Sequence, residues 1–157
     1  MPQLFYRRNL PHFQRDSKTH FLTFCTYKRW VLPAGARSIV LDACIRGNGR
    51  TIDLLAAIVM PDHAHMIFVP RTDQKNCEIF PLARITKAIK GSSSHLIKQQ
   101  FKRTEAVWQE ESFDHVLRSS EKLDEKISYI LYNPVRSGLV SRPEDYRWLW
   151  ARPELIL

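Results

Sequence analysis

Two histidines with metal-binding spacing, His63 and His65, occur in the segment VMPDHAHMIF at positions 59–68. The segment is otherwise typical of a buried β-strand. Residues two apart in a strand project from the same face and lie roughly 7 Å apart along the chain. Two imidazoles in this arrangement can hold one metal ion. The spacing also fits a pair of hydrogen-bonded core histidines, so it leaves both interpretations open.

The second segment with chemically reactive side chains is SSEKLDEKISYILYNPVRSGLV, at positions 119–140. Its apolar spacing predicts an α-helix over 120–133, because Ser120 is a favourable N-cap and Pro134 disfavours continuation of a helix. At about 100° per residue, one face of this helix is apolar and is expected to pack on the core. The residues of that face are Leu123, Ile127 and Ile130.

Tyr129 and Asn133 lie four residues apart on this helix and away from its apolar stripe. A phenol and a carboxamide therefore project together, about 40° apart on the helical wheel. Tyr132 points about 100° away from Asn133, so only Tyr129 shares a face with the carboxamide. The alternative interpretation of Tyr129 is an ordinary amphipathic surface tyrosine.

The remaining segments supply the elements that must position these side chains. Strands are predicted at 19–27, 51–60 and 64–70, short strands or strand-like loops at 106–109 and 114–117, and helices at 36–47, 80–102 and 120–133. The short Pro61-Asp62 turn makes two of the strands an antiparallel hairpin. Strands and helices interleaved around such a hairpin predict an α+β layer fold. We expect a basic N-terminal arm at 1–18 and a single domain at 19–157.

The chain carries a net charge of +8, which favours a polyanionic partner such as nucleic acid or anionic lipid. The segment at 82–103 contains no acidic residue and is predicted to be a helix with an apolar face and a basic face, with a kink or loosening around Gly91 and the serines after it. Its basic face consists of Arg84, Lys87, Lys90, Lys98 and Lys102. This pattern favours phosphate contacts, and a merely solvated charged face is the alternative.

Several classes of protein are disfavoured by the sequence. The N-terminus MPQLFYRRNL has no apolar run of signal-peptide length, and no segment approaches the roughly 20 apolar residues of a membrane span. We therefore expect a cytoplasmic, DNA-associated protein with no membrane contact. Three widely separated cysteines indicate neither a disulfide framework nor a zinc knuckle.

The segment MPDHAHMIF resembles the His-hydrophobic-His signature of the HUH single-strand endonucleases, with Ala64 as the apolar middle residue. Together with VWQEESFDHVLR and YILYNPVRSGLV, it resembles the REP-associated tyrosine transposases, relatives of the insertion-sequence 200 type of single-tyrosine transposase. The similarity runs from about Tyr6 to Trp148. The resemblance implies the HUH endonuclease fold, a ferredoxin-like antiparallel sheet with helices packed on it. It further implies His63 and His65 on a central strand.

The same resemblance implies that Tyr129 is the nucleophile and Asn133 the third metal ligand. Tyr129 would cleave single-stranded DNA beside a REP-like palindromic hairpin, form a 5′-phosphotyrosine and leave a free 3′-hydroxyl for rejoining. Two imidazoles and a carboxamide oxygen leave open positions on a divalent ion, which can bind a phosphate oxygen. Because the set contains no thiolate, Mg²⁺ or Mn²⁺ fits better than structural zinc. Activation of the phenol requires the metal field or a nearby base.

Candidate DNA contacts are spread over the chain. Arg7 and Arg8, beside two aromatic residues, offer cations and stacking surfaces for single-stranded DNA. The resemblance implies that this arm reads bases next to the hairpin, and a disordered basic tail is the alternative. Arg118 and Arg136 flank the tyrosine helix and could hold phosphates or form structural ion pairs, whereas His115 is expected to pack. The candidates for gripping the hairpin stem are Lys87, Lys90 and Lys98. The resemblance implies either a monomer or a homodimer with shared active sites.

Two other classes of function use the same residue types. A hairpin-binding regulator would keep the fold and the basic helix without cutting DNA. A metal-dependent phosphodiesterase acting on RNA or nucleotides would also use a pair of histidines. All four proposed catalytic positions are filled in this chain, which favours the cleaving enzyme over the regulator.

Overall fold

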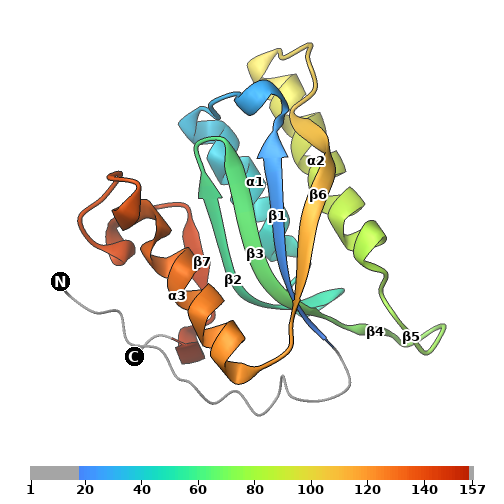
Figure 1. The fold of residues 1–157 in the computed structure, drawn as a ribbon. Coiled ribbons are helices and arrows are strands. Elements are labelled where there is room, and N and C mark those ends of the chain that lie inside the picture. Colours follow the sequence, from blue (N-terminus) through green and yellow to red (C-terminus); the bar gives the residue numbers. More distant parts are fainter. Residues whose placement is uncertain (1–17, 156–157) are drawn as a thin grey trace.

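The computed structural model describes residues 18–155 and consists of a five-stranded sheet with helices on both faces (Figure 1). Its main elements, in chain order, are β1 Thr19–Thr26, α1 Ala34–Arg46, β2 Ile52–Met60, β3 His63–Pro70, α2 Leu82–Phe101, β6 Trp108–Leu117, α3 Ser120–Arg136 and β7 Leu149–Ala151. A small two-stranded ribbon, β4 Thr72–Asp73 and β5 Glu78–Ile79, separates β3 from α2. Among the described residues, no helix is long and apolar enough to cross a membrane.

The sheet has the strand order β6-β1-β3-β2-β7, and every neighbouring pair is antiparallel. The strands β1, β2, β3 and β6 and the helices α1 and α2 form the β-α-β-β-α-β pattern of a ferredoxin-like domain. The helices α1 and α2 cover one face of the sheet, and α3 lies across the other (Figure 1). The predicted α+β fold and its central β2–β3 hairpin are therefore confirmed.

The alternation of side chains along β3 decides which face of the sheet carries the two histidines. Ala64, Met66 and Phe68 pack in the core beneath α1 and α2, whereas Ile67 and Val69 pack in the second core with α3. Because successive strand residues point to opposite faces, the odd-numbered histidines face α3. The strand therefore presents both imidazoles to the helix that carries the tyrosine.

The segment after α2 forms one continuous strand, β6, so the prediction of separate short strands or strand-like loops at 106–109 and 114–117 is wrong. β6 pairs with β1 along most of its length, and the irregular part is absorbed as a bulge. Phe24 pairs with Ser112 and Thr26 pairs with Trp108, which places residues 109–111 opposite a single β1 residue. The segment is extended because it pairs with β1, a strand distant in the sequence, and the local sequence pattern carries no information about that pairing.

Two helices also differ from the sequence prediction. α2 runs unbroken through the glycine-serine stretch, because the buried Ser93 Oγ donates to the Ile89 carbonyl (2.7 Å) and accepts from Trp108 Nε1 (3.0 Å). α3 begins with Ser119 as its N-cap and continues past Pro134. The proline costs one backbone hydrogen bond, but its ring is buried and the Ser137 amide bonds to the Asn133 carbonyl.

Candidate active site

Three of the four predicted catalytic residues converge on the α3 face of the sheet. The ring centroids of His63 and His65 lie 4.8 Å apart, and the Tyr129 ring lies 5.5 Å from that of His65. Phe21 of β1 stacks on His65 at 5.2 Å and meets the edge of Tyr129 at 6.2 Å. The tyrosine side chain is 40% exposed, so its phenol is accessible to a ligand that also approaches the imidazoles.

Each histidine is held through its Nδ1 atom. His65 Nδ1 lies 2.7 Å from Thr23 Oγ1, and His63 Nδ1 lies 2.7 Å from Asp62 Oδ1. An ionised carboxylate only accepts hydrogen bonds, so His63 donates from Nδ1, and Nε2 is the ring nitrogen left to face a ligand. The Thr23 hydroxyl allows the same tautomer at His65 by accepting from Nδ1. This orientation through the far nitrogen is typical of histidines that bind a metal.

The charge states of these groups also suit a metal site. Burial lowers the pKa of His65 to about 3, with smaller contributions from the nearby charges of His63 and Lys126, so this imidazole is neutral at physiological pH. Burial alone raises the pKa of Asp62, but the hydrogen bond from His63 and the charge of Arg29 outweigh it and keep that pKa below its ordinary value. Arg29 Nε donates to Asp62 Oδ2 at 3.1 Å. Asp62 is therefore an ionised carboxylate that orients His63.

Asn133 differs from the sequence prediction, because its side chain is buried rather than projecting away from the core beside Tyr129. The chain after α3 folds back over the last helical turn, where the amides of Leu139 and Val140 bond to the Pro134 carbonyl. Asn133 Oδ1 accepts from the Ser137 hydroxyl at 3.3 Å. The Asn133 carboxamide is therefore held in place by its surroundings. Tyr129, one helical turn earlier, is exposed.

Two buried side-chain polar atoms lack a hydrogen-bond partner within residues 18–155, and they are His65 Nε2 and Asn133 Nδ2. Both belong to residues predicted as metal ligands, and buried atoms without partners are rare in folded proteins. A 180° rotation of the Asn133 amide keeps a bond to Ser137 and places Oδ1 where Nδ2 stands. By their chemistry, two imidazole nitrogens and one carboxamide oxygen suit a divalent ion.

No cluster of three or more histidine, cysteine, aspartate or glutamate side chains that could hold a metal is present in the described part of the chain. A metal centre at His63 and His65 therefore depends on a ligand of another type, and the carboxamide of Asn133 is the residue that the sequence nominates for it. Such an incomplete ligand set leaves open coordination positions, as expected for a catalytic centre rather than a structural one.

Two cations flank the tyrosine ring. The guanidinium carbon of Arg136 lies 4.7 Å from the Tyr129 ring centroid, and the Lys126 ammonium lies 5.5 Å from it and 4.9 Å from the Phe21 ring. Arg136 Nη2 also donates to the Tyr129 carbonyl at 2.5 Å, which orients the guanidinium. The nucleophile candidate therefore lies in a positive local field, which favours a phosphate group.

Four residues that contact this site were not predicted from the sequence, namely Thr23, Asp62, Lys126 and Phe21. Two of them carry a local signal. Asp62 directly precedes His63, and Lys126 lies three residues before Tyr129 on the same helical face. Thr23 and Phe21 have none, because only the pairing of β1 with β3 brings them beside His65.

The other predicted DNA contacts lie in different places. Arg7 and Arg8 lie outside the described residues. Arg118 is exposed in the connection between β6 and α3, and His115 is exposed on β6, so the expected packing role of His115 is wrong. The pairing register puts His115 beside Phe21 on an edge strand that α3 does not bury.

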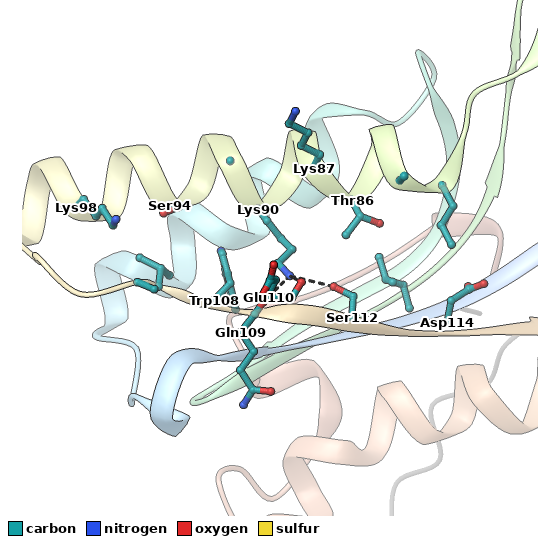
Figure 2. A pocket seen from close by; sticks show the side chains of 16 residues that line it. Thr86, Lys87, Lys90, Ser94, Lys98, Trp108, Gln109, Glu110, Ser112 and Asp114 are labelled. Carbon is teal, nitrogen blue, oxygen red and sulfur yellow. Dashed lines mark hydrogen bonds between the residues drawn. The ribbon is translucent and has the colours of Figure 1, made fainter.

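A cleft of about 650 Å³ lies between α2 and β6, on the opposite face of the sheet from the histidines (Figure 2). Lys87 and Lys98 line it and are exposed. Lys90 also lines it, but its Nζ donates to the carbonyl of Gln109 (2.7 Å), the carbonyl of Glu110 (3.2 Å) and Ser112 Oγ (3.1 Å) (Figure 2). An ammonium has three donors, so Lys90 is fully engaged in fastening the β6 bulge to α2.

Replacing Lys90 with methionine should lower the free energy of unfolding by about 1–2 kcal/mol, because two bulge carbonyls lose a charged donor. Burial already lowers the pKa of Lys90, with opposing contributions from Cys25 and Glu110, which agrees with an ammonium drawn into the protein. Urea denaturation measures the effect. The matched variant Lys87→Met should change stability by less than about 0.5 kcal/mol. Equal effects of the two variants would contradict a structural role for Lys90.

The sequence matches the family described as Transposase IS200 like over residues 13–130, three quarters of the chain. The chain belongs to this family. The matched region contains His63, His65 and Tyr129 and stops before Asn133. The predicted resemblance to REP-associated tyrosine transposases is confirmed by the relatives described next.

A curated relative from Haemophilus influenzae, named as a putative REP-associated tyrosine transposase, is 26% identical over 98 residues. The match covers 60% of this chain and 56% of the relative, so it spans little more than half of that protein. A solved REP-associated tyrosine transposase bound to a REP hairpin has a TM-score of 0.66 at 22% identity, covering 95% of this chain and 82% of the other.

A crystal structure of a putative transposase from Deinococcus radiodurans is similar at a lower level. It has a TM-score of 0.50 at 23% identity and covers 80% of this chain and 96% of the other. At 22% and 23% identity, the two structural matches show that this chain shares their fold, and nothing more. They agree with the ferredoxin-like architecture described above.

Proposed function

We propose that this IS200-like transposase cleaves and rejoins single-stranded DNA beside hairpins, through a 5′-phosphotyrosine at Tyr129 and with a divalent ion, Mg²⁺ or Mn²⁺. The observation that carries the proposal is the convergence of Tyr129 with His63 and with His65, whose buried Nε2 has no hydrogen-bond partner within residues 18–155. The solved relative bound to a REP hairpin supports hairpin DNA as the substrate class.

The reaction follows from the chemistry of the groups at the site. Tyr129 Oη gives up its proton to solvent and attacks the phosphorus in line, the bond from phosphorus to the 3′-oxygen breaks, and that oxygen takes a proton from solvent and leaves as a 3′-hydroxyl. Lys126 and Arg136, which flank the phenol, offset charge on the phosphoryl oxygens. A divalent ion held by His63, His65 and Asn133 would polarise a non-bridging oxygen. Attack of a 3′-hydroxyl on the phosphotyrosine reverses the step and restores the phenol.

One experiment separates this function from the two alternatives. The full chain is incubated with Mn²⁺ and a labelled oligonucleotide that folds into a REP-type hairpin with unpaired flanks, and the products are resolved on a denaturing gel. A protein-linked DNA band supports the transposase. Binding without such a band identifies a regulator that does not cut, and free fragments without a linked band identify a hydrolytic phosphodiesterase.

The hairpin stem is proposed to contact α2, where Lys87 and Lys98 are exposed and Lys90 is engaged with β6. A Lys87→Ala, Lys98→Ala double variant should bind the hairpin more weakly, and its slope of log affinity against log salt should be smaller by about 2. Titrations between roughly 50 and 200 mM salt measure this slope. Lys75→Ala, at an exposed position in the β4–β5 ribbon, is the control and should leave it unchanged. An unaltered slope in the double variant would contradict stem binding at α2.

A further inference from the structure

Phe113 of β6 is the most exposed aromatic residue in the described part of the chain, with 53% of its area accessible. It lies in a row of directly paired residues that crosses the sheet. Phe113 pairs with Thr23, Thr23 pairs with His65, and His65 pairs with Ile58. Directly paired residues share a face of the sheet, so Phe113 and the histidines lie on the same face.

Exposure along this row rises from the buried centre of the sheet to its edge. Ile58 is fully buried and His65 is 6% exposed, whereas Thr23 is half-buried and Phe113 is open. The reason is that the core under α3 is built from β1, β2 and β3, whereas of β6 only Leu117, at its end, packs against it. Glu111 and His115, two residues before and after Phe113, are exposed as well. An uncovered strip of sheet therefore leads away from the candidate active site.

The distance from this strip to the site suits a strand of nucleic acid. Two strand spacings of about 4.8 Å place the Phe113 backbone about 10 Å from that of His65. A stacked strand rises about 3.4 Å per nucleotide, so a phosphate beside His65 puts a base over Phe113 within about three nucleotides. The exposed carboxylate of Glu111 disfavours a phosphate at this point, whereas an aromatic ring offers a stacking surface to any base.

We propose that Phe113 is a stacking platform for an unpaired base of the DNA strand engaged at Tyr129. This inference rests on the proposed function, because it assumes that a single strand reaches the histidines. Phe113 positions the strand and takes no part in bond breaking. The base would lie on the open α3 side of β6, separate from the cleft between α2 and β6 on the opposite face.

The test compares two probes in the presence of a chelator, so that no cleavage occurs. One is a labelled hairpin with unpaired flanks, and the other is the same hairpin without flanks. Phe113→Ala should weaken binding of the flanked probe by about 5- to 150-fold, the range expected for loss of one stacked base, and leave the flankless probe unchanged. Phe113→Trp should restore binding. Phe101→Ala, which removes a 38% exposed aromatic residue at the end of α2, should affect neither probe.

A second readout locates the base directly. Flank positions substituted with 5-iodouracil are irradiated, and cross-linked peptides are mapped by mass spectrometry; the proposal expects a cross-link at Phe113. The platform is overturned if both probes weaken equally, if neither weakens, or if Phe113→Ala changes the oligomeric state in light scattering instead of DNA affinity. If the separate Mn²⁺ assay gives an adduct at Tyr129 but Phe113→Ala causes no flank-dependent loss, the platform alone is overturned. If Phe113→Ala causes a flank-dependent loss but the Mn²⁺ assay gives no adduct, the platform is supported and the cleavage proposal is overturned.

Discussion

Tyr129→Phe should abolish the covalent protein–DNA product and leave hairpin binding nearly intact. The variant removes only the phenolic oxygen, so the ring keeps its contacts with His65, Phe21 and Arg136. Loss of the nucleophile should lower the cleavage rate by a factor on the order of 10⁶, comparable to removal of a nucleophilic side chain in a well-studied hydrolase. A denaturing gel with labelled hairpin DNA and Mn²⁺ measures the adduct, and a native binding assay measures affinity.

Tyr132→Phe is the matched control for this prediction, because it removes a phenolic hydroxyl from the same helix three residues later. Tyr132 is partly buried and packs against the core beneath α3, whereas Tyr129 is exposed beside the histidines. The control should retain the adduct. An adduct that persists in Tyr129→Phe and disappears in Tyr132→Phe would reverse the assignment of the nucleophile.

His65→Gln should remove both the response to metal and most of the cleavage activity. The variant takes away a neutral imidazole whose buried Nε2 has no hydrogen-bond partner in the described part of the chain. A bound ion that polarises a phosphate contributes several kcal/mol to the transition state, so cleavage should fall by about 10²- to 10⁴-fold. In the wild type, Mn²⁺ should raise the thermal unfolding midpoint because it binds the folded state, and His65→Gln should lose this shift.

The metal prediction has a control within the chain. His95 is exposed on α2, on the opposite face of the sheet, and His95→Gln should keep the Mn²⁺ shift and the adduct. Chelation of the wild-type protein should reproduce the His65→Gln phenotype, and added Mn²⁺ should reverse it only in the wild type. Wild-type rates of adduct formation by His65→Gln in chelator would disprove a metal role for this residue.

Much of the candidate site could be predicted from local sequence patterns. Side-chain alternation in a strand puts His63 and His65 on one face wherever that strand lies, and the order of strands and helices leads to the α+β class. The positive charge of α2 could also be predicted, because it depends only on composition and helical spacing. These properties arise from neighbouring residues and need no information about distant segments.

Contacts between distant segments were decided only by the tertiary structure. Which residue holds His65 depends on the register of β1 against β3, and that register depends on burying both faces of the sheet at once. The same packing turns Lys90 inward to the β6 bulge, buries Asn133 under the chain that follows α3, and leaves Phe113 uncovered. Local patterns specify the face on which a side chain stands, whereas its neighbours across that face come from long-range burial of apolar surface.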